Sequence, residues 1–448
     1  MKSRSSLIPV ILSLNKNMGL LRIWQQPFLK KRVIYHLRVK GVIMTQYFFY
    51  ETEERNSTGI HVEPTRYYKS GVGFGFSYSS RLPELNTGFI PGPEVLKEIE
   101  VKQDQNGCYV DSRSAFFPLS FQADVKQQGT YLMTITLYSE EEENEVLLFL
   151  GRRQLVWRGS LKAQEEWCQS FPVTITDFIP RGETGRFRDG SVKVTVISRS
   201  VRLKKLDIKK WKGRTIYLAG DSTVTDQTAD YPYNPAESYG GWGQMLPAFL
   251  NGAYSVSNHA HSGLTTESFR SEGHYKIVME NITEGDICLF QFGHNDQKLD
   301  HLGAAEGYRN NLIQYVEEIR KKGAIPVFIT PLARNSWLEN GRIYDDRLKE
   351  YGKEVIELSK NMAVPVVDLH DMSMEFIKEH GLHQSGQWFY PSDYTHTNDY
   401  GAWKMAGFVW KGLIKSGVIS SDGKKIPVWE PPKGEVRLSI NKEENIYE

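Results

Sequence analysis

The chain has 448 residues, and its length together with 40% hydrophobic and 12% aromatic residues predicts a folded protein of two domains, which excludes a disordered chain. Nine basic and no acidic side chains lie in residues 1–45, so the rest of the chain is net acidic. A net acidic body gives no electrostatic basis for binding nucleic acid or an anionic membrane, and we expect neither as a partner.

Residues 1–57 are a basic leader that we leave out of the predicted fold. Residues 7–14 resemble the apolar core of a signal peptide, but this run is short, contains Pro9 and lacks an obvious small-residue cleavage site. No stretch reaches the ~18 apolar residues of a membrane-spanning helix. We therefore expect a cytoplasmic protein, with secretion as the alternative, whose natural start is either Met1 or near Met44.

Residues 58–205 have the pattern of an all-β sandwich. Apolar side chains alternate with period two from Tyr131 to Leu137, which is typical of a strand with one buried face. The polar run 139–144 predicts a turn, and 146–150 then predicts the returning strand. The basic run 201–212 indicates the end of this domain.

Residues 213–420 change to apolar runs of strand length that alternate with helical patterns. The strand-like runs are 215–219, 254–257, 286–292, 325–330 and 364–368. Apolar side chains recur at helical spacing in 304–320 and 400–415. This alternation predicts an α/β domain with a parallel, doubly wound sheet covered by helices on both faces. Residues 421–448 predict a polar tail.

Polar and small residues collect at the ends of three predicted strands and before the last predicted helix. The segments are Gly220-Asp-Ser-Thr223, Asn258-His-Ala-His-Ser-Gly263, Gly293-His-Asn-Asp296 and Asp393-Tyr-Thr-His396. Each segment alone is a weak signal, because such short patterns occur often by chance. The active sites of open parallel sheets lie at the carboxyl ends of the strands, so the four segments together predict one site.

The order and spacing of these segments resemble the four blocks of SGNH (GDSL-type) hydrolases. Within that class the sequence is similar to rhamnogalacturonan acetylesterases, over roughly residues 214–413. The sequence segments that resemble this family are Gly220-Asp-Ser-Thr-Val224, Gly241-Trp-Gly-Gln244, Phe292-Gly-His-Asn-Asp-Gln297, Thr330-Pro-Leu-Ala-Arg334 and Asp393-Tyr-Thr-His-Thr397. The resemblance implies a flavodoxin-like sheet and an esterase acting on acetylated pectic oligosaccharides. The β half resembles, more loosely, the galactose-binding-like sandwich that precedes some of these esterases.

The residues themselves predict a serine mechanism. A serine hydroxyl needs a base to remove its proton, and His396 is the candidate base for Ser222. Asp393 lies three residues before His396, close enough to orient its ring. By analogy with the class, the oxyanion is bound by the backbone N–H groups of Ser222 and Gly263 and by the Asn295 side chain. Glycine suits position 263 because no Cβ obstructs the acyl oxygen.

Four further residues are candidates for substrate binding: Thr223, His261, Lys298 and Arg334. Lys298 and Arg334 suit a uronate carboxylate, with a simple surface role as an equal alternative. His259 and His261 stand where the class has variable small residues, so they alter the predicted pocket. Two metal ligands would be the other interpretation, but no Cys or carboxylate lies at suitable spacing, and we predict neither a metal ion nor another cofactor.

Other roles are open to some of these residues. Asp221 and Asp296 are predicted to hold their loops by accepting backbone hydrogen bonds, with a catalytic role as the alternative. Ser222 alone would fit a helix N-cap. The chain has no Gly-x-Ser-x-Gly, which excludes the nucleophile elbow of α/β-hydrolases, and no Gly-x-Gly-x-x-Gly or phosphate loop for a nucleotide.

Alternatives to a rhamnogalacturonan substrate stay open at this point. They are an acetylesterase for another glycan such as xylan, a non-catalytic carbohydrate-binding protein, and a lipid esterase. The sandwich would bind sugar through Tyr138, Trp157 or Trp167, whereas the alternating pattern favours a scaffold role for it. The sequence predicts neither the oligomeric state nor the sugar hydroxyl that carries the acetyl group.

Overall fold

The computed structural model describes residues 37–39, 42–51, 59–69, 73–77, 87–95, 99–180, 183–420, 423 and 427–433. The chain divides into residues 1–35 and residues 36–448, and all described residues belong to the second unit. Most of the predicted leader 1–57 and of the predicted tail 421–448 lies outside the described residues. No helix in the described ranges is long and apolar enough to span a membrane.

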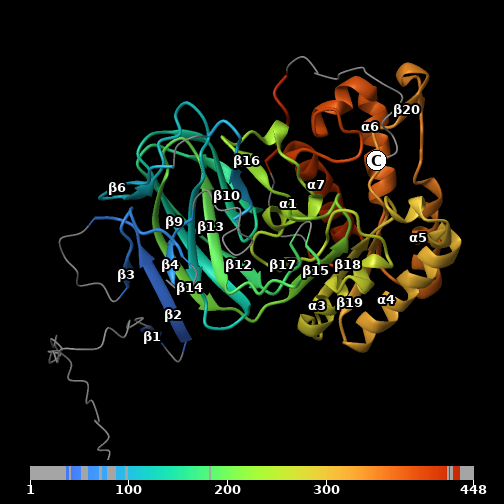
Figure 1. Cartoon of the computed structure of the whole chain (residues 1–448), viewed down its shortest axis with the longest axis horizontal. Coiled ribbons are helices and arrows are strands. Elements are labelled where there is room, and N and C mark those ends of the chain that lie inside the picture. Colours follow the sequence, from blue (N-terminus) through green and yellow to red (C-terminus); the bar gives the residue numbers. More distant parts are fainter. Residues whose placement is uncertain are drawn as a thin grey trace, which may run out of the picture. The chain divides into compact units, whose positions relative to one another are not determined.

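The first half of the described chain is rich in strands, as predicted, and forms two mainly antiparallel sheets (Figure 1). The larger sheet contains β1 Leu37–Val39, β2 Val42–Phe48, β3 Ile60–His61, β6 Lys102–Asp104, β7 Gly107–Tyr109, β9 Gly129–Ser139, β12 Glu165–Ile175 and β14 Arg202–Lys210. The smaller sheet contains β4 Phe74–Phe76, β8 Leu119–Asp124, β10 Glu143–Leu150, β11 Gln154–Leu161 and β13 Ser191–Ile197. Aromatic rings join the sheets, since Tyr47 of β2 packs on Phe121 of β8 with centroids 5.2 Å apart. A galactose-binding-like fold for this region stays a prediction.

The alternating pattern identified the buried face of β9 correctly. Tyr131, Met133, Ile135 and Leu137 are at most 7% exposed. The prediction that 146–150 returns beside this strand is wrong, because β10 pairs with β11 and β13, whereas β9 pairs with β12 and β14. A period of two identifies which face of a strand is buried, but it does not identify the neighbouring strand.

The strands extend past both predicted ends of the β domain. β14 continues beyond residue 205 and pairs with β9 and with β2, which precedes residue 58. The charged side chains of this run make the strand hard to recognise: Leu206 and Ile208 are buried, and Lys205, Asp207 and Lys209 alternate with them. The basic run therefore forms part of the larger sheet.

The second half contains the predicted parallel sheet. Its strands are β15 Thr215–Gly220, β17 Ser255–Asn258, β18 Ile287–Gln291, β19 Ile325–Ile329 and β22 Val366–Val367. Their order across the sheet is β17-β15-β18-β19-β22, and every neighbouring pair is parallel. This 2-1-3-4-5 order is that of flavodoxin-like, doubly wound sheets.

Helices cover both faces of the parallel sheet (Figure 1). They are α1 Trp242–Phe249, α2 Ser268–Ser271, α3 His274–Asn281, α4 Arg309–Lys321, α5 Lys349–Met362, α6 Leu369–Ser385 and α7 Asp399–Lys415. Tyr217 and Phe290 belong to one core together with α3, α4 and α5, whereas Leu218 and Leu289 face α1, α7 and the β region. Successive strand residues thus point to opposite faces, as the pleat requires.

The helix predicted at 400–415 is present as α7, but the one predicted at 304–320 begins later, at Arg309. A π-turn precedes it, in which Glu306 has φ −121° and ψ −109°, outside the helical region. The short helical turns are η2 Pro235–Glu237, η3 Asp296–Lys298, η4 Asp300–Leu302, η5 Ala304–Tyr308, η6 Glu339–Gly341 and η7 Gly386–Trp388.

The β-rich half and the α/β half are joined by a pair of strands, one from each half. β5 Phe89–Pro91, from the β-rich half, pairs in parallel with β16 Ala229–Tyr231 from the α/β half. A hairpin of β20 Trp337–Leu338 and β21 Ile343–Tyr344 follows β19. The pairing of β5 with β16 brings the β-rich half against the loops that follow β15.

Candidate active site

The predicted site residues lie in loops at the carboxyl end of the parallel sheet and just before α7. Ser222 follows β15, Gly263 lies in the loop after β17, and Asn295 lies in the loop after β18. Asp393 and His396 precede α7, whose N-cap is the side chain of Asn398. These strand ends meet at one edge because all the strands are parallel.

Ser222, His396 and Asp393 form a continuous chain of hydrogen bonds. The Ser222 Oγ lies 2.7 Å from His396 Nε2, and His396 Nδ1 lies 2.8 Å from Asp393 Oδ2. The other oxygen of Asp393 accepts the backbone N–H groups of Thr395 and His396 at 2.7 and 2.8 Å. Asp393 therefore fixes both the ring of His396 and the loop that carries it.

The electrostatics of the pair favour an ionised Asp393. Burial raises the pKa of Asp393, but the hydrogen bond and charge of His396 and the backbone N–H groups outweigh it, so the net pKa lies below its usual value. A carboxylate at Nδ1 holds the proton on that nitrogen, which leaves Nε2 to accept the proton of Ser222. The arrangement suits a neutral imidazole acting as a base.

Asn295 and Gly263 were predicted to bind an oxyanion. The Asn295 Nδ2 donates one hydrogen bond, 3.0 Å long, to the carbonyl of Leu264, and an amide carries a second N–H. Gly263 is exposed and has φ +87°, and a Cβ added there would meet no atom within 4 Å. The left-handed backbone is a reason for glycine that the sequence did not indicate, and the clearance it leaves for an acyl oxygen stays a prediction.

Asp221 and Asp296 hold the loops, as predicted. The Asp221 Oδ1 accepts the backbone N–H and the hydroxyl of Thr223 at 3.0 and 2.8 Å, and its Oδ2 lies 3.1 Å from His294 Nδ1. The Asp296 Oδ1 accepts the backbone N–H of Thr266 at 2.9 Å, and its Oδ2 accepts that of Gly293 at 3.1 Å. Both carboxyl groups are fully buried, so they bond the loops and cannot reach a substrate.

Thr223, one of the predicted substrate-binding residues, is buried inside the fold. Thr223 is 1% exposed, and its hydroxyl donates to Asp221 and accepts from Gln291 Nε2 at 2.6 Å. The prediction that Thr223 contacts substrate is therefore corrected, because its hydroxyl is fully used inside the fold. Lys298, by contrast, is exposed at the end of η3.

Arg334 is half-buried next to the loop that carries Asp393 and His396. Its Nη1 donates to the hydroxyl of Thr395, between Asp393 and His396, and its Nη2 donates to the carbonyl of His294 at 3.4 Å. Its Nε is buried and has no hydrogen-bond partner. A contact between Arg334 and a substrate carboxylate stays a prediction.

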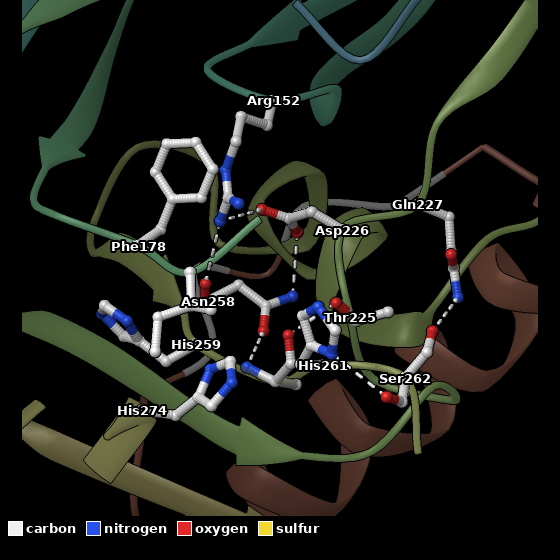
Figure 2. Close-up of a pocket in the computed structure, with 12 residues that line it drawn as sticks. Arg152, Phe178, Thr225, Asp226, Gln227, Asn258, His259, His261, Ser262 and His274 are labelled. Atoms are coloured by element: carbon white, nitrogen blue, oxygen red, sulfur yellow. Dashed lines mark hydrogen bonds and ion pairs between the residues drawn. The ribbon is translucent and has the colours of Figure 1, made fainter. Parts of the chain in front are cut away.

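A small pocket lies beside Ser262, the residue before Gly263 (Figure 2). His259, His261 and His274 line one side, and Arg152 lies over the ring of Phe178 on the other. Burial lowers the pKa of His259 to about 3 and, together with His261, that of His274 to about 4. The volume of about 30 Å³ admits a water or two and no sugar ring. Within the ranges described, no three His, Cys, Asp or Glu side chains are placed to hold a metal ion.

Comparison with known proteins gives the family. A model of the GDSL-like lipase/acylhydrolase family matches residues 218–404. The rhamnogalacturonan acetylesterase RhgT of Bacillus subtilis is 34% identical over 229 residues, which are 47% of this chain and 96% of that protein. The chain belongs to the GDSL-like lipase/acylhydrolase family. It is therefore an esterase.

Two further similarities accompany this match. The probable rhamnogalacturonan acetylesterase YesY of Bacillus subtilis is 35% identical over 211 residues, 45% of this chain and 94% of that protein. A crystal structure of the YxiM protein from Bacillus subtilis covers 84% of this chain and all of that chain, at 21% identity and a TM-score of 0.45. The family match begins within β15 and ends within α7, so it contains every predicted site residue of the esterase and leaves out the β-rich region.

Sequence reasoning missed two residues next to the site of this esterase. Gln227 donates through Nε2 to the carbonyl of Ser222 at 3.1 Å and to the hydroxyl of Ser262 at 3.5 Å. Arg153, from the turn between β10 and β11, is 0% exposed and reaches the same loop. Neither residue belongs to a motif, and the signal for Arg153 is an arginine pair one residue after the apolar strand β10.

Proposed function

We propose that this esterase removes O-acetyl groups from rhamnogalacturonan oligosaccharides, with Ser222 as nucleophile, His396 as base and Asp393 as the group that orients His396. The observation that carries the mechanism is the chain of hydrogen bonds from Ser222 Oγ through His396 to Asp393, 2.7 and 2.8 Å long. Hydrogen-bond contact between nucleophile and base, with the base oriented by a third group, is the arrangement that activates a serine.

The reaction then proceeds in two halves. The Ser222 Oγ attacks the acetyl carbon while His396 Nε2 takes its proton, and Asp393 stabilises the imidazolium that forms. His396 returns the proton to the departing sugar oxygen, which leaves an acetyl group on Ser222. Water, deprotonated by His396, attacks this acetyl-enzyme, and acetate leaves as Ser222 regains its proton.

The negative oxygen of each tetrahedral intermediate needs donors that are already in place. The backbone N–H groups of Ser222 and Gly263 and the amide of Asn295 fill this role in the proposal. The bond from Asn295 to the carbonyl of Leu264 holds the amide, and its second N–H is then available to the oxyanion. The left-handed backbone of Gly263 sets the direction of its N–H.

The substrate assignment rests on the two relatives named as rhamnogalacturonan acetylesterases, at 34% and 35% identity. Rhamnogalacturonan carries uronate carboxylates, and the half-buried Arg334 and the exposed Lys298 offer positive charge beside the site. We assign the β-rich region a scaffold role. Trp157 and Trp167 pack against each other with ring centroids 4.3 Å apart, so each ring covers a face of the other that a sugar would need.

Acetate release tests the proposal. The wild type, Ser222→Ala and the control Ser271→Ala, an exposed serine of α2, are incubated with acetylated rhamnogalacturonan oligosaccharides, acetylated xylan and a long-chain ester. We expect release from the pectic substrate by the wild type and Ser271→Ala, and none by Ser222→Ala. Release from xylan alone would keep the mechanism and overturn the substrate. No release from any ester by folded wild type would overturn the mechanism and favour a binding protein.

A further inference from the structure

The turn between β10 and β11 places two consecutive arginines of the β-rich region against the loops of the active site. Arg153 has φ +67°, a left-handed backbone that is uncommon for a residue with a side chain, and it is 0% exposed. A Cβ on Gly88 would come within 2.4 Å of the Cβ of Arg153, so the neighbouring backbone closes over it. A strained and fully buried arginine persists only where its surroundings hold it.

All three nitrogens of the Arg153 guanidinium are bonded to residues of the α/β half. Its Nε donates to the carbonyl of Gln227 at 2.9 Å, and its Nη1 donates to Asp399 Oδ2 at 2.6 Å. Its Nη2 donates to the carbonyl of Tyr239 and to Gln244 Oε1. Asp399 is also 0% exposed, so the two charges form a completely buried ion pair.

One set of these bonds leads to Ser222. The carbonyl of Gln227 accepts from both Arg153 and Gln244, which fixes the backbone at residue 227. The side chain of Gln227 then donates to the carbonyl of Ser222. Arg153 is thus two hydrogen-bonded contacts away from the backbone of the proposed nucleophile.

The other set leads to His396. Asp399 begins α7 three residues after His396. The ring of Tyr239 meets His396 edge-on, with centroids 5.8 Å apart, and the next residue, Gly240, accepts the hydroxyl of Thr397 at 2.6 Å. The guanidinium therefore joins the loop of the nucleophile to the loop of the base.

The neighbouring Arg152, from the same turn, binds the end of strand β17 and the loop after β15. Its Nη2 donates to the carbonyl of Asn258 at 3.3 Å and lies 3.8 Å from a carboxylate oxygen of Asp226 (Figure 2). Asn258 ends β17, the strand that leads to Gly263. The turn thus contacts the loops that carry the proposed nucleophile and base, and the end of the strand that leads to the proposed oxyanion donor Gly263.

We infer that Arg153 is a positioning residue of the esterase: it holds the Ser222 and His396 loops in register, so that the β-rich scaffold supports the geometry of the active site. The inference rests on the proposed function, because it assumes that Ser222 and His396 react. Arg153 lies outside residues 218–404, so the family match does not contain it. Displacement of a reacting group by about 1 Å can cost on the order of 10² in rate.

The test separates turnover from the amount of active protein. Arg153→Met is titrated with a fluorophosphonate, which counts reactive serines, and its kcat and KM for para-nitrophenyl acetate are calculated per titrated site. We expect full titration, a KM close to that of the wild type and a kcat per site lowered on the order of 10–100-fold. Arg153→Lys keeps the charge and loses the fork of donors, so we expect an intermediate kcat.

The control is Arg158→Met, which removes an arginine of β11 that makes a bidentate ion pair with Glu145, at 2.9 and 2.7 Å. We expect its kcat per site to be unchanged. A kcat per titrated site within twofold of the wild type in Arg153→Met overturns the inference, whether titration is full or reduced, since Arg153 then acts on stability alone. If Arg153→Met does not fold, the same criterion applies to Arg153→Lys.

The activity of Ser222→Ala tests the proposed function independently of the Arg153 variants. If wild type and Arg158→Met hydrolyse the ester and Ser222→Ala does not, the proposed function holds and only the Arg153 variants decide the inference. If Ser222→Ala is as active as the wild type, the proposed function fails, whatever Arg153→Met does.

Discussion

The proposed role of Asn295 is to donate one side-chain N–H to the oxyanion. Its amide is held by the carbonyl of Leu264, and the proposal gives its second N–H to the oxyanion. We expect Asn295→Ala to lower kcat on the order of 10²–10³, the usual cost of losing one such donor. Asn281→Ala is the matched control, because that amide also donates to one backbone carbonyl, 2.8 Å away, but lies in α3. Equal kcat values for the two variants would contradict the role of Asn295.

The Asp221 carboxyl makes the stability of the site depend on pH. Burial raises its pKa, but the charge and hydrogen bond of His294 and the two donors of Thr223 lower it below the ordinary 3.8. A carboxyl with a lowered folded pKa contributes stability that is complete above the unfolded pKa and is lost as the pH falls through the folded value. Asp221→Asn should therefore lower the free energy of unfolding most at neutral pH.

Denaturant unfolding at pH values from about 7 to about 3 checks this linkage. We expect the difference in unfolding free energy between the wild type and Asp221→Asn to shrink below pH 3.8. The exposed Asp371→Asn serves as the control and should show no such change. A difference that stays constant across the range would mean that Asp221 is not the titrating group.

Among the elements, the loop after β17 depends on a left-handed backbone at Gly263. Gly263 has φ +87° and Gly417, at the end of α7, has φ +72°, and a Cβ would meet no atom at either position. An alanine should therefore cost each site a similar strain of about 1–2 kcal/mol. We expect both variants to lose this stability in denaturant unfolding, but only Gly263→Ala to lose kcat. Alanine keeps the backbone N–H, so the loss would come from its displacement, and unchanged kcat in Gly263→Ala would contradict the need for a glycine backbone to direct this N–H.

The elements that the sequence predicted well are those with a strong local pattern. The strands before Ser222 and Asn295 are short apolar runs that end in polar residues, and the structure places both where the pattern indicated. Asp221 and Asp296 were also assigned correctly to loop support, because a short carboxylate readily accepts nearby backbone N–H groups.

The parts that sequence did not predict depend on contacts between distant segments. The crossing of β10 into the smaller sheet and the central place of β14 are decided by partners far along the chain. Thr223 looks like a site residue until its burial is known, and Arg153 joins Asp399 across 246 positions. No periodicity reports such pairings, so they became visible only in the folded chain.

At the level of the whole molecule, the two halves are joined by more than a linker. β5 pairs with β16 across the boundary, and the Arg153–Asp399 ion pair has 0% exposure on both sides. Unfolding of the β-rich half alone would take Arg153 from this pair, and loss of one partner of a buried pair typically costs about 3–5 kcal/mol where the other charge stays buried. We therefore expect a single calorimetric transition in which both halves unfold together. Two transitions in the wild type, one for each half, would contradict this coupling.

The residue that a fluorophosphonate modifies identifies the nucleophile of this esterase. The wild type and His396→Ala are treated with the probe, digested and mapped by mass spectrometry. We expect an adduct on the peptide that contains Ser222 in the wild type, formed far more slowly when the base is absent. Labelling of a different serine, or equal rates of Ser222 labelling in the two proteins, would contradict the proposed mechanism.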